Sequence, residues 1–310
     1  MEIRHLRCFL AVAEELHFAR AAQRLHIEQS PLSRAIKELE EDLGVLLFNR
    51  TTRSTRLTQA GRLFLDSVPR VFTALEQARS SVKAAAAGFQ EQLRVALSDG
   101  LTPLRLTALL AQCRAEEPDV DIRLFQVPLS QQLRGLEDDL YDVGFAQSAE
   151  VGDGIVAEPA WSDPLVVVVP ARHPLLKYKR IPLGEVLRYP LVMGDPQQCE
   201  GYDRQIARLL RTTEQDPLVA EQVSSVDLLL TLVAAGYALA LIGASHFAAY
   251  KHPELVCRPL AGRSPMLTTW LLRPDTDPSE TLTRFIDRVS PMGPPPPAAP
   301  IPMLNEESSP

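Results

Sequence analysis

The chain contains few cysteines, and their spacing suggests no pairs. The four, at positions 8, 113, 199 and 257, form no CxxC motif, so we expect reduced, buried thiols in a cytoplasmic protein. A redox switch between Cys113 and either Cys199 or Cys257 is the alternative. The six histidines are scattered along the sequence, and no metal site is predicted from them.

Long apolar runs and catalytic signatures are also missing. No charged segment followed by an apolar run opens the chain, and no run approaches the roughly 18 apolar residues of a membrane-spanning helix. Secretion and membrane insertion are therefore not expected. The sequence has no Gly-x-Ser-x-Gly motif, no P-loop and no GxGxxG motif, so we predict neither an enzyme nor a cofactor.

Two amphipathic helices joined by a short turn are predicted near the beginning of the chain. Their apolar stripes, spaced at i, i+3, i+4 and i+7, are Phe18, Ala21, Ala22 and Leu25, and then Leu32, Ala35, Ile36 and Leu39. Ser30 is predicted to cap the second helix, with Pro31 at its first position. The outer face then carries Ser33, Arg34 and Lys37, which suit a helix that enters a DNA major groove about 12 Å wide. With an upstream amphipathic helix, this pattern predicts a helix-turn-helix domain; a three-helix domain of another kind is the alternative.

A basic hairpin is predicted after the two helices. Leu47-Phe48 and Arg56-Leu57-Thr58 favour two short strands. Between positions 43 and 65 the sequence has no acid and four arginines, at 50, 53, 56 and 62, a local charge of +4 in a chain of net charge −7. Beside a helix-turn-helix, such a hairpin is typical of a wing that contacts phosphates or the adjacent minor groove. The acidic run at positions 40 to 42 is interpreted as a solvated helix face.

Four sequence motifs identify a family. They are AAQRLH in the first helix of the pair, SPLSR at the start of the second, LGVLLFNR in the first strand and LTQAG after the hairpin. With them, the first 65 or so residues closely resemble the winged helix-turn-helix of the LysR-type transcriptional regulators, and the layout agrees to about residue 290. Glu28 departs from the family, which more often has a small polar residue there. The resemblance implies a ligand-responsive regulator with a winged helix-turn-helix, a long linker helix and a two-lobed α/β effector domain like a periplasmic binding protein.

The first expected partner is the double-stranded DNA of a promoter operator. Gln29, Pro31 and Ser33 are predicted to read base edges, whereas Arg34 and the wing would hold phosphates. The full set of predicted DNA-binding residues is Gln29, Ser30, Pro31, Ser33, Arg34, Lys37, Arg50, Arg53 and Arg56.

A long helix from Thr58 to about Gly88 is predicted to pair with a second copy. Its apolar residues follow steps of four and three, at Phe64, Val68, Val71, Leu75, Ala78, Val82, Ala85 and Phe89, which is typical of helix pairing. We expect a homodimer, and by resemblance a homotetramer and a contact with RNA polymerase; a long core helix is the alternative. Pro69 predicts a kink or local loosening, and the run of alanines ending at Gly88 predicts a hinge.

The predicted domains are 1–58 for the winged helix-turn-helix, 59–90 for the linker helix and hinge, 91–290 for the regulatory domain and 291–310 for a tail. Short strands alternate with helical patterns in the regulatory domain, which predicts a parallel sheet with helices on its faces. The predicted strands are 93–97, 122–127, 143–146, 165–169, 191–193, 238–242 and 269–272. The resemblance divides this domain into one lobe of 91–163 with 266–290 and another of 164–265. The tail has eight prolines in twenty residues and is predicted to be disordered.

Effector-binding residues are predicted from the strand ends and from the resemblance, because ligands in such folds lie beyond the carboxyl ends of strands. They are Ser98, Leu101, Thr102, Val127, Phe145, Gln147, Gly194, Tyr202 and Ser225. No lysine or arginine lies between Arg134 and Arg172, so a small aromatic or weakly anionic effector is expected. Two other classes stay open: a small-molecule-binding protein or enzyme with a helical dimerisation module, and an architectural DNA protein without a ligand.

Overall fold

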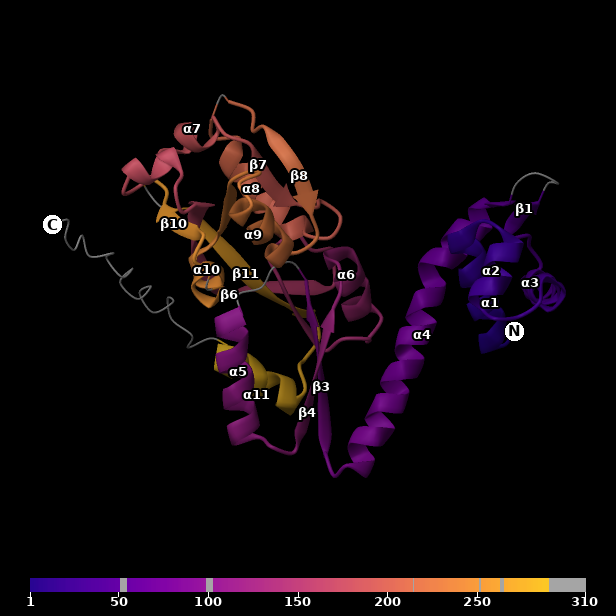
Figure 1. The fold of residues 1–310 in the computed structure, drawn as a ribbon. Helices are drawn as coiled ribbons and strands as arrows, with labels where there is room; N and C mark the ends of the chain where they lie inside the picture. Colours follow the sequence, from indigo (N-terminus) through magenta and orange to yellow (C-terminus); the bar gives the residue numbers. More distant parts are fainter. Residues whose placement is uncertain (51–54, 99–102, 214, 251, 263–264, 290–310) are drawn as a thin grey trace. The chain divides into compact units, whose positions relative to one another are not determined.

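The structure is a computed structural model that describes residues 1–50, 55–98, 103–213, 215–250, 252–262 and 265–289. Its contacts divide the chain into two compact units, Met1–Val82 and Lys83–Pro310, which Figure 1 colours along the sequence. Each unit has its own hydrophobic core. The predicted disorder of the tail over 291–310 lies outside the described residues.

The first unit consists of helices and a hairpin around one core. Its elements are α1 (Ile3–Glu15), α2 (Phe18–Arg24), α3 (Gln29–Leu43), β1 (Phe48–Arg50), β2 (Thr55–Leu57) and most of α4 (Gln59–Ala86). Both predicted apolar stripes pack in this core, as the helical spacing requires. The ring of Phe9 in α1 packs on Phe48 of the hairpin and on Phe64 of α4, with centroids 5.4 and 4.9 Å away. One cluster therefore holds the helices, the hairpin and the start of the linker helix together.

Helix α4 continues through Pro69 without ending there. Phe64 and Val68 pack into the core of the first unit, which corrects the prediction that they belong to the pairing seam. They are needed inside because the first turns of α4 cover the hairpin and α1. Further along the same stripe, Val71 and Val82 are 47% and 71% exposed, so an apolar stripe is left on the surface of this unit.

The alanine run at the end of α4 is mostly helical. The helix extends to Ala86, and the backbone bends only at Gly88, whose φ is +94°. A positive φ of this kind is easily adopted by glycine. Most of the predicted hinge range is therefore helical, and its last two residues lie beyond the helix.

The second unit contains the remaining elements. They are β3 (Glu91–Leu97), α5 (Pro103–Glu116), β4 (Val120–Gln126), α6 (Leu129–Glu137), β5 (Val143–Ala146), β6 (Ile155–Pro170), η1 (Pro174–Lys177), α7 (Leu183–Val186), β7 (Leu191–Gly194), α8 (Glu200–Leu210), β8 (Val219–Val223), α9 (Val226–Ala234), β9 (Ala240–Gly243), α10 (Ala244–Ala249), β10 (Leu255–Pro259), β11 (Met266–Pro274) and α11 (Glu280–Val289). The strand order is β10-β6-β11-β5-β3-β4, with β9 also paired to β6, and β7 pairs with β8.

The sheet is mixed, which corrects the prediction of a parallel sheet. Strand β3 is parallel to β4 and β5, and β7 is parallel to β8. Strands β6 and β11, in contrast, are antiparallel to each other, and β11 is antiparallel to β5. The reason is that these two long strands return between the two halves of the unit instead of following a helix crossover.

Two lobes share β6 and β11, as predicted for a two-lobed α/β domain (Figure 1). Lobe I consists of β3, β4 and β5 with α5 and α11 in one core cluster and α6 in another. Lobe II consists of β7 to β10, with α7 and α8 packed in one cluster and α9 and α10 in another. Helices thus cover both faces of each lobe, and the crossing strands connect the lobes.

Candidate functional site

Helix α3 turns a polar face to the surface of the first unit. Its buried side is apolar, with Leu32, Ile36 and Leu39 fully buried. Of the predicted DNA-binding residues on this helix, Ser33 is half-buried and the others are exposed, namely Gln29, Ser30, Pro31, Arg34 and Lys37. Of the predicted base-reading residues, Gln29 and Ser33 are therefore about one helical turn apart, whereas Pro31 lies on another part of the helix surface.

The start of α3 differs from the prediction that Ser30 is its cap. The helix begins at Gln29 after Glu28, whose side chain makes no capping hydrogen bond. The backbone oxygen of Glu28 instead accepts from the N–H of Leu32 at 3.4 Å. Pro31 is consequently the third helical residue, a position where a backbone N–H would also lack a helical partner. The proline was expected at the first helical position and stands at the third, but it is tolerated for the same reason, because no helical hydrogen bond is lost there.

The hairpin β1–β2 corresponds to the predicted wing. Its strands are antiparallel, with Asn49 opposite Arg56 and Arg50 opposite Thr55. Arg56 is exposed, as a phosphate-binding residue must be. Arg50 ends β1, but its side chain lies outside the described residues, as does all of Arg53.

Thr58 joins the hairpin to α4. Its hydroxyl donates to the carbonyl of Leu46 at 2.7 Å and accepts from the N–H of Gly61 at 2.9 Å. Its own N–H donates to the carbonyl of Leu47 at 2.9 Å. Gly61 is needed because a Cβ there would lie 2.1 Å from the Leu47 oxygen. The LTQAG motif is therefore a structural joint between the wing and the linker helix.

The acidic run after Leu39 is only partly the solvated face that was predicted. Glu40 is 7% exposed, and its Oε1 accepts from the backbone N–H groups of Leu47 at 2.9 Å and Phe48 at 3.1 Å. Glu41 does lie in solvent, with its Oε1 3.4 Å from Nζ of Lys37. The buried member of the run is thus attached to the base of the wing.

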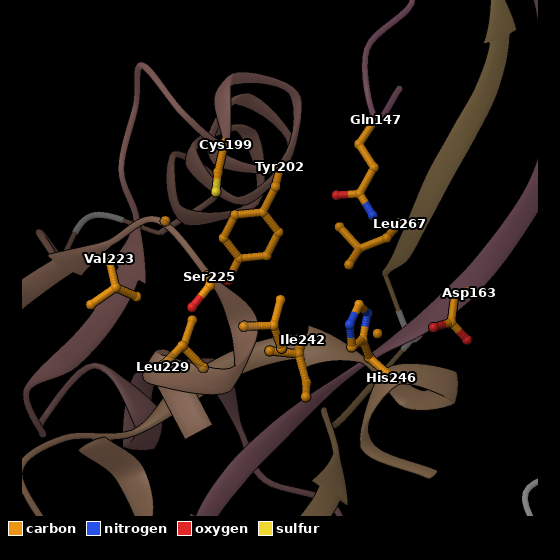
Figure 2. A pocket seen from close by; sticks show the side chains of 13 residues that line it. Gln147, Asp163, Cys199, Tyr202, Val223, Ser225, Leu229, Ile242, His246 and Leu267 are labelled. Atoms are coloured by element: carbon orange, nitrogen blue, oxygen red, sulfur yellow. The ribbon is translucent and has the colours of Figure 1, made fainter. Parts of the chain in front are cut away.

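A cavity lies in the second unit, between lobe II and the crossing strands. Its volume is about 20 Å³, enough for one or two water molecules. The apolar lining consists of Val223, Val226, Leu229, Ile242 and Leu267. The remaining lining residues are Gln147, Asp163, Gly194, Cys199, Tyr202, Ser225, Gly243 and His246, and Figure 2 shows the His246 ring between Leu267 and Ile242.

Burial shifts the pKa of two titratable groups in this cavity. Burial raises the pKa of Asp163, while hydrogen bonds from Ser245 and the charge of Arg105 act in the opposite direction. The Ser245 hydroxyl donates to the carboxylate at 2.7 Å and its N–H at 3.0 Å. Burial lowers the pKa of His246, opposed by the charge of Asp227, so the imidazole is neutral at pH 7. Among the described residues that line the cavity there is no lysine or arginine.

Tyr202 forms one wall of the cavity. Its hydroxyl donates to the carbonyl of Leu241, and burial raises its pKa. Gly194 makes room for the ring, since a Cβ at that position would lie 2.8 Å from the ring atom Cδ1. The tyrosine therefore contributes an apolar surface to the cavity, with its hydroxyl already bonded.

Four of the predicted effector residues line the cavity, namely Gln147, Gly194, Tyr202 and Ser225. Phe145 does not: it is fully buried, and its ring packs on Trp161 at 4.9 Å. The alternation of strand β5 turns its side chain into the core of lobe I. Ser98 is also fully buried, with its N–H donating to the Phe145 carbonyl at 3.0 Å, and Val127 packs against a second cluster of lobe I. Leu101 and Thr102 lie outside the described residues.

The prediction missed other lining residues. They are Asp163, Cys199, Val223, Val226, Leu229, Ile242, Gly243, His246 and Leu267. The rule that ligands lie at strand ends could have found Gly243, which ends β9, and His246 just after it. Asp163 lies within β6, and no sequence signal marked it.

Helix α8 of lobe II is bonded to lobe I beside the cavity. The amide nitrogen of Gln205 donates to the backbone oxygens of Gln147 at 2.7 Å and Thr268 at 2.8 Å, and its oxygen accepts from the Thr268 N–H at 3.0 Å. Glu150, which follows β5, pairs with Arg204 at 2.8 Å and with Arg208 at 3.3 Å. We call these contacts the lobe latch.

The cysteines give no support to the alternative of a redox pair. All four are free. Cys113 lies in a core cluster of lobe I, whereas Cys199 and Cys257 pack against two different clusters of lobe II. Among the described residues, no group of histidines, cysteines or acids could hold a metal ion, and none of the described helices is long and apolar enough to span a membrane.

Both units match known protein families. Residues 3–62 match the bacterial regulatory helix-turn-helix proteins of the lysR family, and residues 86–292 match the LysR substrate binding domain. The chain belongs to the LysR family of transcriptional regulators. It is a DNA-binding regulator with an effector-binding domain, as the sequence motifs predicted.

Individual relatives agree with this LysR assignment. The transcriptional regulator AlsR of Bacillus subtilis is 30% identical over 245 residues, which cover 79% of this chain and 81% of that protein. BenM of Acinetobacter baylyi is 30% identical over 247 residues, 79% of this chain and 81% of that protein. These relatives are transcriptional regulators, which excludes the enzyme alternative.

Solved structures show the same fold. The crystal structure of CbnR, a LysR family transcriptional regulator, matches with a TM-score of 0.73 and 27% identity over 94% of this chain and 98% of that one. Full-length CbnR complexed with its target DNA matches with a TM-score of 0.71 and 27% identity over 94% and 99% of the two chains. The two-lobed α/β architecture with an N-terminal helix-turn-helix is therefore confirmed.

Proposed function

We propose that this LysR-type regulator docks on promoter DNA with α3 in the major groove and the hairpin β1–β2 on neighbouring phosphates. The exposed polar face of α3 and the arginines of the hairpin support this arrangement. We assign base reading to Gln29, Pro31 and Ser33. Phosphate contacts are assigned to Ser30, Arg34, Lys37, Arg50, Arg53 and Arg56. Lys37 would exchange its exposed pair with Glu41 for a phosphate, at little cost, because exposed pairs contribute at most about 1 kcal/mol.

Two copies would bind through α4. The exposed apolar stripe that includes Val71 and Val82 supports pairing, since large apolar side chains on a helix surface favour a partner helix. A dimer would occupy two half-sites about 34 Å apart or a multiple of that distance. Pairing of dimers into a tetramer, contact with RNA polymerase and a cytoplasmic location extend the proposal, and the resemblance to LysR regulators supports them.

The effector is proposed to bind in the cavity beside the lobe latch. An apolar wall with one neutral imidazole and one serine hydroxyl suits a small aromatic or other apolar molecule that carries a hydrogen-bonding group. Asp163 and the lack of lysine or arginine in the described lining disfavour the weakly anionic alternative. We therefore narrow the predicted effector class to uncharged molecules.

Effector binding would shift a population of lobe arrangements. A cavity of about 20 Å³ is too small for an aromatic ring, so the cavity must enlarge before the ligand enters, and we assign this enlargement to a movement of lobe II relative to Gln147 of lobe I. A ligand that binds one arrangement more tightly increases its share. Through the second unit this change would reach α4 and alter the spacing or bending of the bound half-sites.

Two substitutions distinguish base reading from phosphate contact. Arg56→Ala should weaken binding to all sequences and lower the slope of log K against log salt by about 0.9. Ser33→Ala, which removes a hydroxyl assigned to base reading, should relax base preference. Arg79→Ala, which removes an exposed arginine of α4 paired with Glu76, is the control and should change neither. Wild-type operator affinity for both test variants would refute the docking.

A further inference from the structure

A buried carboxylate connects the recognition helix to the wing. We propose that Glu40 is a positioning residue for DNA binding: its carboxylate holds the hairpin at a fixed place relative to α3, so that both elements reach one DNA site together. The proposal rests on the docking described above, in which the hairpin contacts phosphates. It assigns a role to a residue whose carboxylate is buried against the base of the hairpin and is not exposed to DNA.

The geometry of Glu40 is that of a two-point anchor. A single oxygen, Oε1, accepts from the N–H groups of two consecutive residues, Leu47 at 2.9 Å and Phe48 at 3.1 Å. Both residues are almost completely buried, at 1% and 2% exposed. Hydrogen bonds to a charged acceptor are stronger than neutral ones, and buried N–H groups left without an acceptor are costly. Strand β1 therefore cannot slide along α3 without losing two buried bonds at once.

The hairpin depends on this anchor because it is too short to be stable alone. Among the described residues of the hairpin, three pairs join β1 to β2, and Asn49 lies opposite Arg56 in this register. An isolated two-stranded hairpin is marginal in water. Arg50 follows Phe48 by two residues, so a displacement at Phe48 moves the arginines directly. Thr58 connects the base of the hairpin to the start of α4, and Glu40 supplies the hydrogen bonds from the recognition helix, beside the apolar contacts of the core.

Glu40→Leu tests the role because leucine fills the space but accepts no hydrogen bond. Binding is measured on a DNA fragment that the wild-type chain protects, over a range of salt, with a hydroxyl-radical footprint, at a temperature where circular dichroism shows each variant folded. We expect an affinity about 10- to 100-fold lower and a salt slope reduced by about 1 to 2, since each lost phosphate contact removes about 0.9. Protection of the backbone under the wing should disappear, while base preference in the major groove is kept.

Two conservative variants keep the test informative. Glu40→Gln retains an oxygen with the same reach and should restore the footprint and most of the slope. Glu40→Asp keeps the charge but is shorter by one methylene group, so it should lose the wing contacts as the leucine variant does. It therefore provides the same test if the leucine variant fails to fold.

Val12→Ala is the matched control for a purely structural effect. Val12 is fully buried in the core of the same unit, and it makes none of the bonds to the hairpin. Its loss should lower the melting temperature and leave the salt slope and footprint of the folded protein unchanged. A wild-type slope and footprint for Glu40→Leu, or an equal loss for Val12→Ala, overturns the proposal.

Arg56→Ala distinguishes the positioning role of Glu40 from the docking of the wing on DNA. A reduced slope for Arg56→Ala with a normal slope for Glu40→Leu refutes only the positioning role. A normal slope for Arg56→Ala refutes the docking of the wing, and the role of Glu40 with it.

Discussion

Replacing Gln205 with alanine should loosen lobe I from lobe II in the regulatory domain. The side chain lies on α8 and makes three hydrogen bonds, one to the backbone of Gln147 and two to the backbone of Thr268. Gln147 follows β5 of lobe I, whereas Thr268 lies on the crossing strand β11. The amide thus joins a helix of lobe II to the other lobe and to the strand between them.

The size of the effect follows from these bonds. A hydrogen bond contributes about 1 kcal/mol net, so losing three lowers the free energy of unfolding by about 2 to 3 kcal/mol. For a domain of this size the melting temperature should fall by roughly 5 to 10 °C. Of the three bonds made by Gln205, the one to Gln147 joins the two lobes, and its loss of about 1 kcal/mol reduces the ratio of closed to open domain about fivefold.

Thermal unfolding and amide hydrogen exchange measure both effects. The Thr268 N–H, which donates to the Gln205 oxygen at 3.0 Å, should exchange faster in the variant. Arg188→Ala is the control, because its pair with Glu185 lies within lobe II, the arginine side chain is 68% exposed, and such pairs contribute at most about 1 kcal/mol. Wild-type melting and wild-type protection of Thr268 in Gln205→Ala would refute the idea of a lobe latch.

Three further substitutions test other parts of the account. Gly61→Ala places a Cβ 2.1 Å from the Leu47 oxygen, so it should cost about 1 to 3 kcal/mol of stability and weaken DNA binding; normal melting and normal gel shifts would contradict this. Burial raises the pKa of Asp163 in the folded state. The free energy of unfolding should therefore fall as pH rises from the pKa of the unfolded chain through the higher pKa of the folded protein. Asp163→Asn should gain stability over the wild type in urea unfolding at pH 8, with the difference vanishing at acid pH, and a less stable variant at pH 8 would be the opposite result. Val82→Glu charges a residue that is 71% exposed in one chain and should shift sedimentation towards monomer with little change in melting, whereas a dimer of wild-type strength would exclude α4 as the pairing surface.

The winged helix-turn-helix could be predicted because its signals are local. The stripe through Leu32, Ile36 and Leu39 packs as the helical period requires. The start of α3 was placed wrongly because Ser30 is a typical cap residue. In the structure the backbone carbonyl of Glu28 begins the helix and no side chain caps it, which leaves no signal in the sequence.

The regulatory domain was less predictable because its strands pair over long distances. Only the part of β6 around residues 165–169 was predicted, since Pro159 and Pro164 interrupt the pattern. The strand nevertheless runs from Ile155 to Pro170, and its register with β11 shifts next to Pro159, where a missing N–H is tolerated. Strand β8 was missed because only Val223 of its residues is buried.

The effector site shows the same limit. Gln147 and Gly194 were found because they stand at the ends of strands. Phe145 was misplaced because all of β5 is buried, so no alternation of polar and apolar residues reveals which face each side chain takes. Asp163 and His246 come from distant segments that only the fold brings together.

Footprinting of the purified chain on the DNA around its own coding region, at two salt concentrations, tests the central claim most directly. The account predicts two protected half-sites spaced by about one helical turn or a multiple of it, with affinity that falls steeply as salt rises. Absence of any specific protection, or protection that is insensitive to salt, would contradict it.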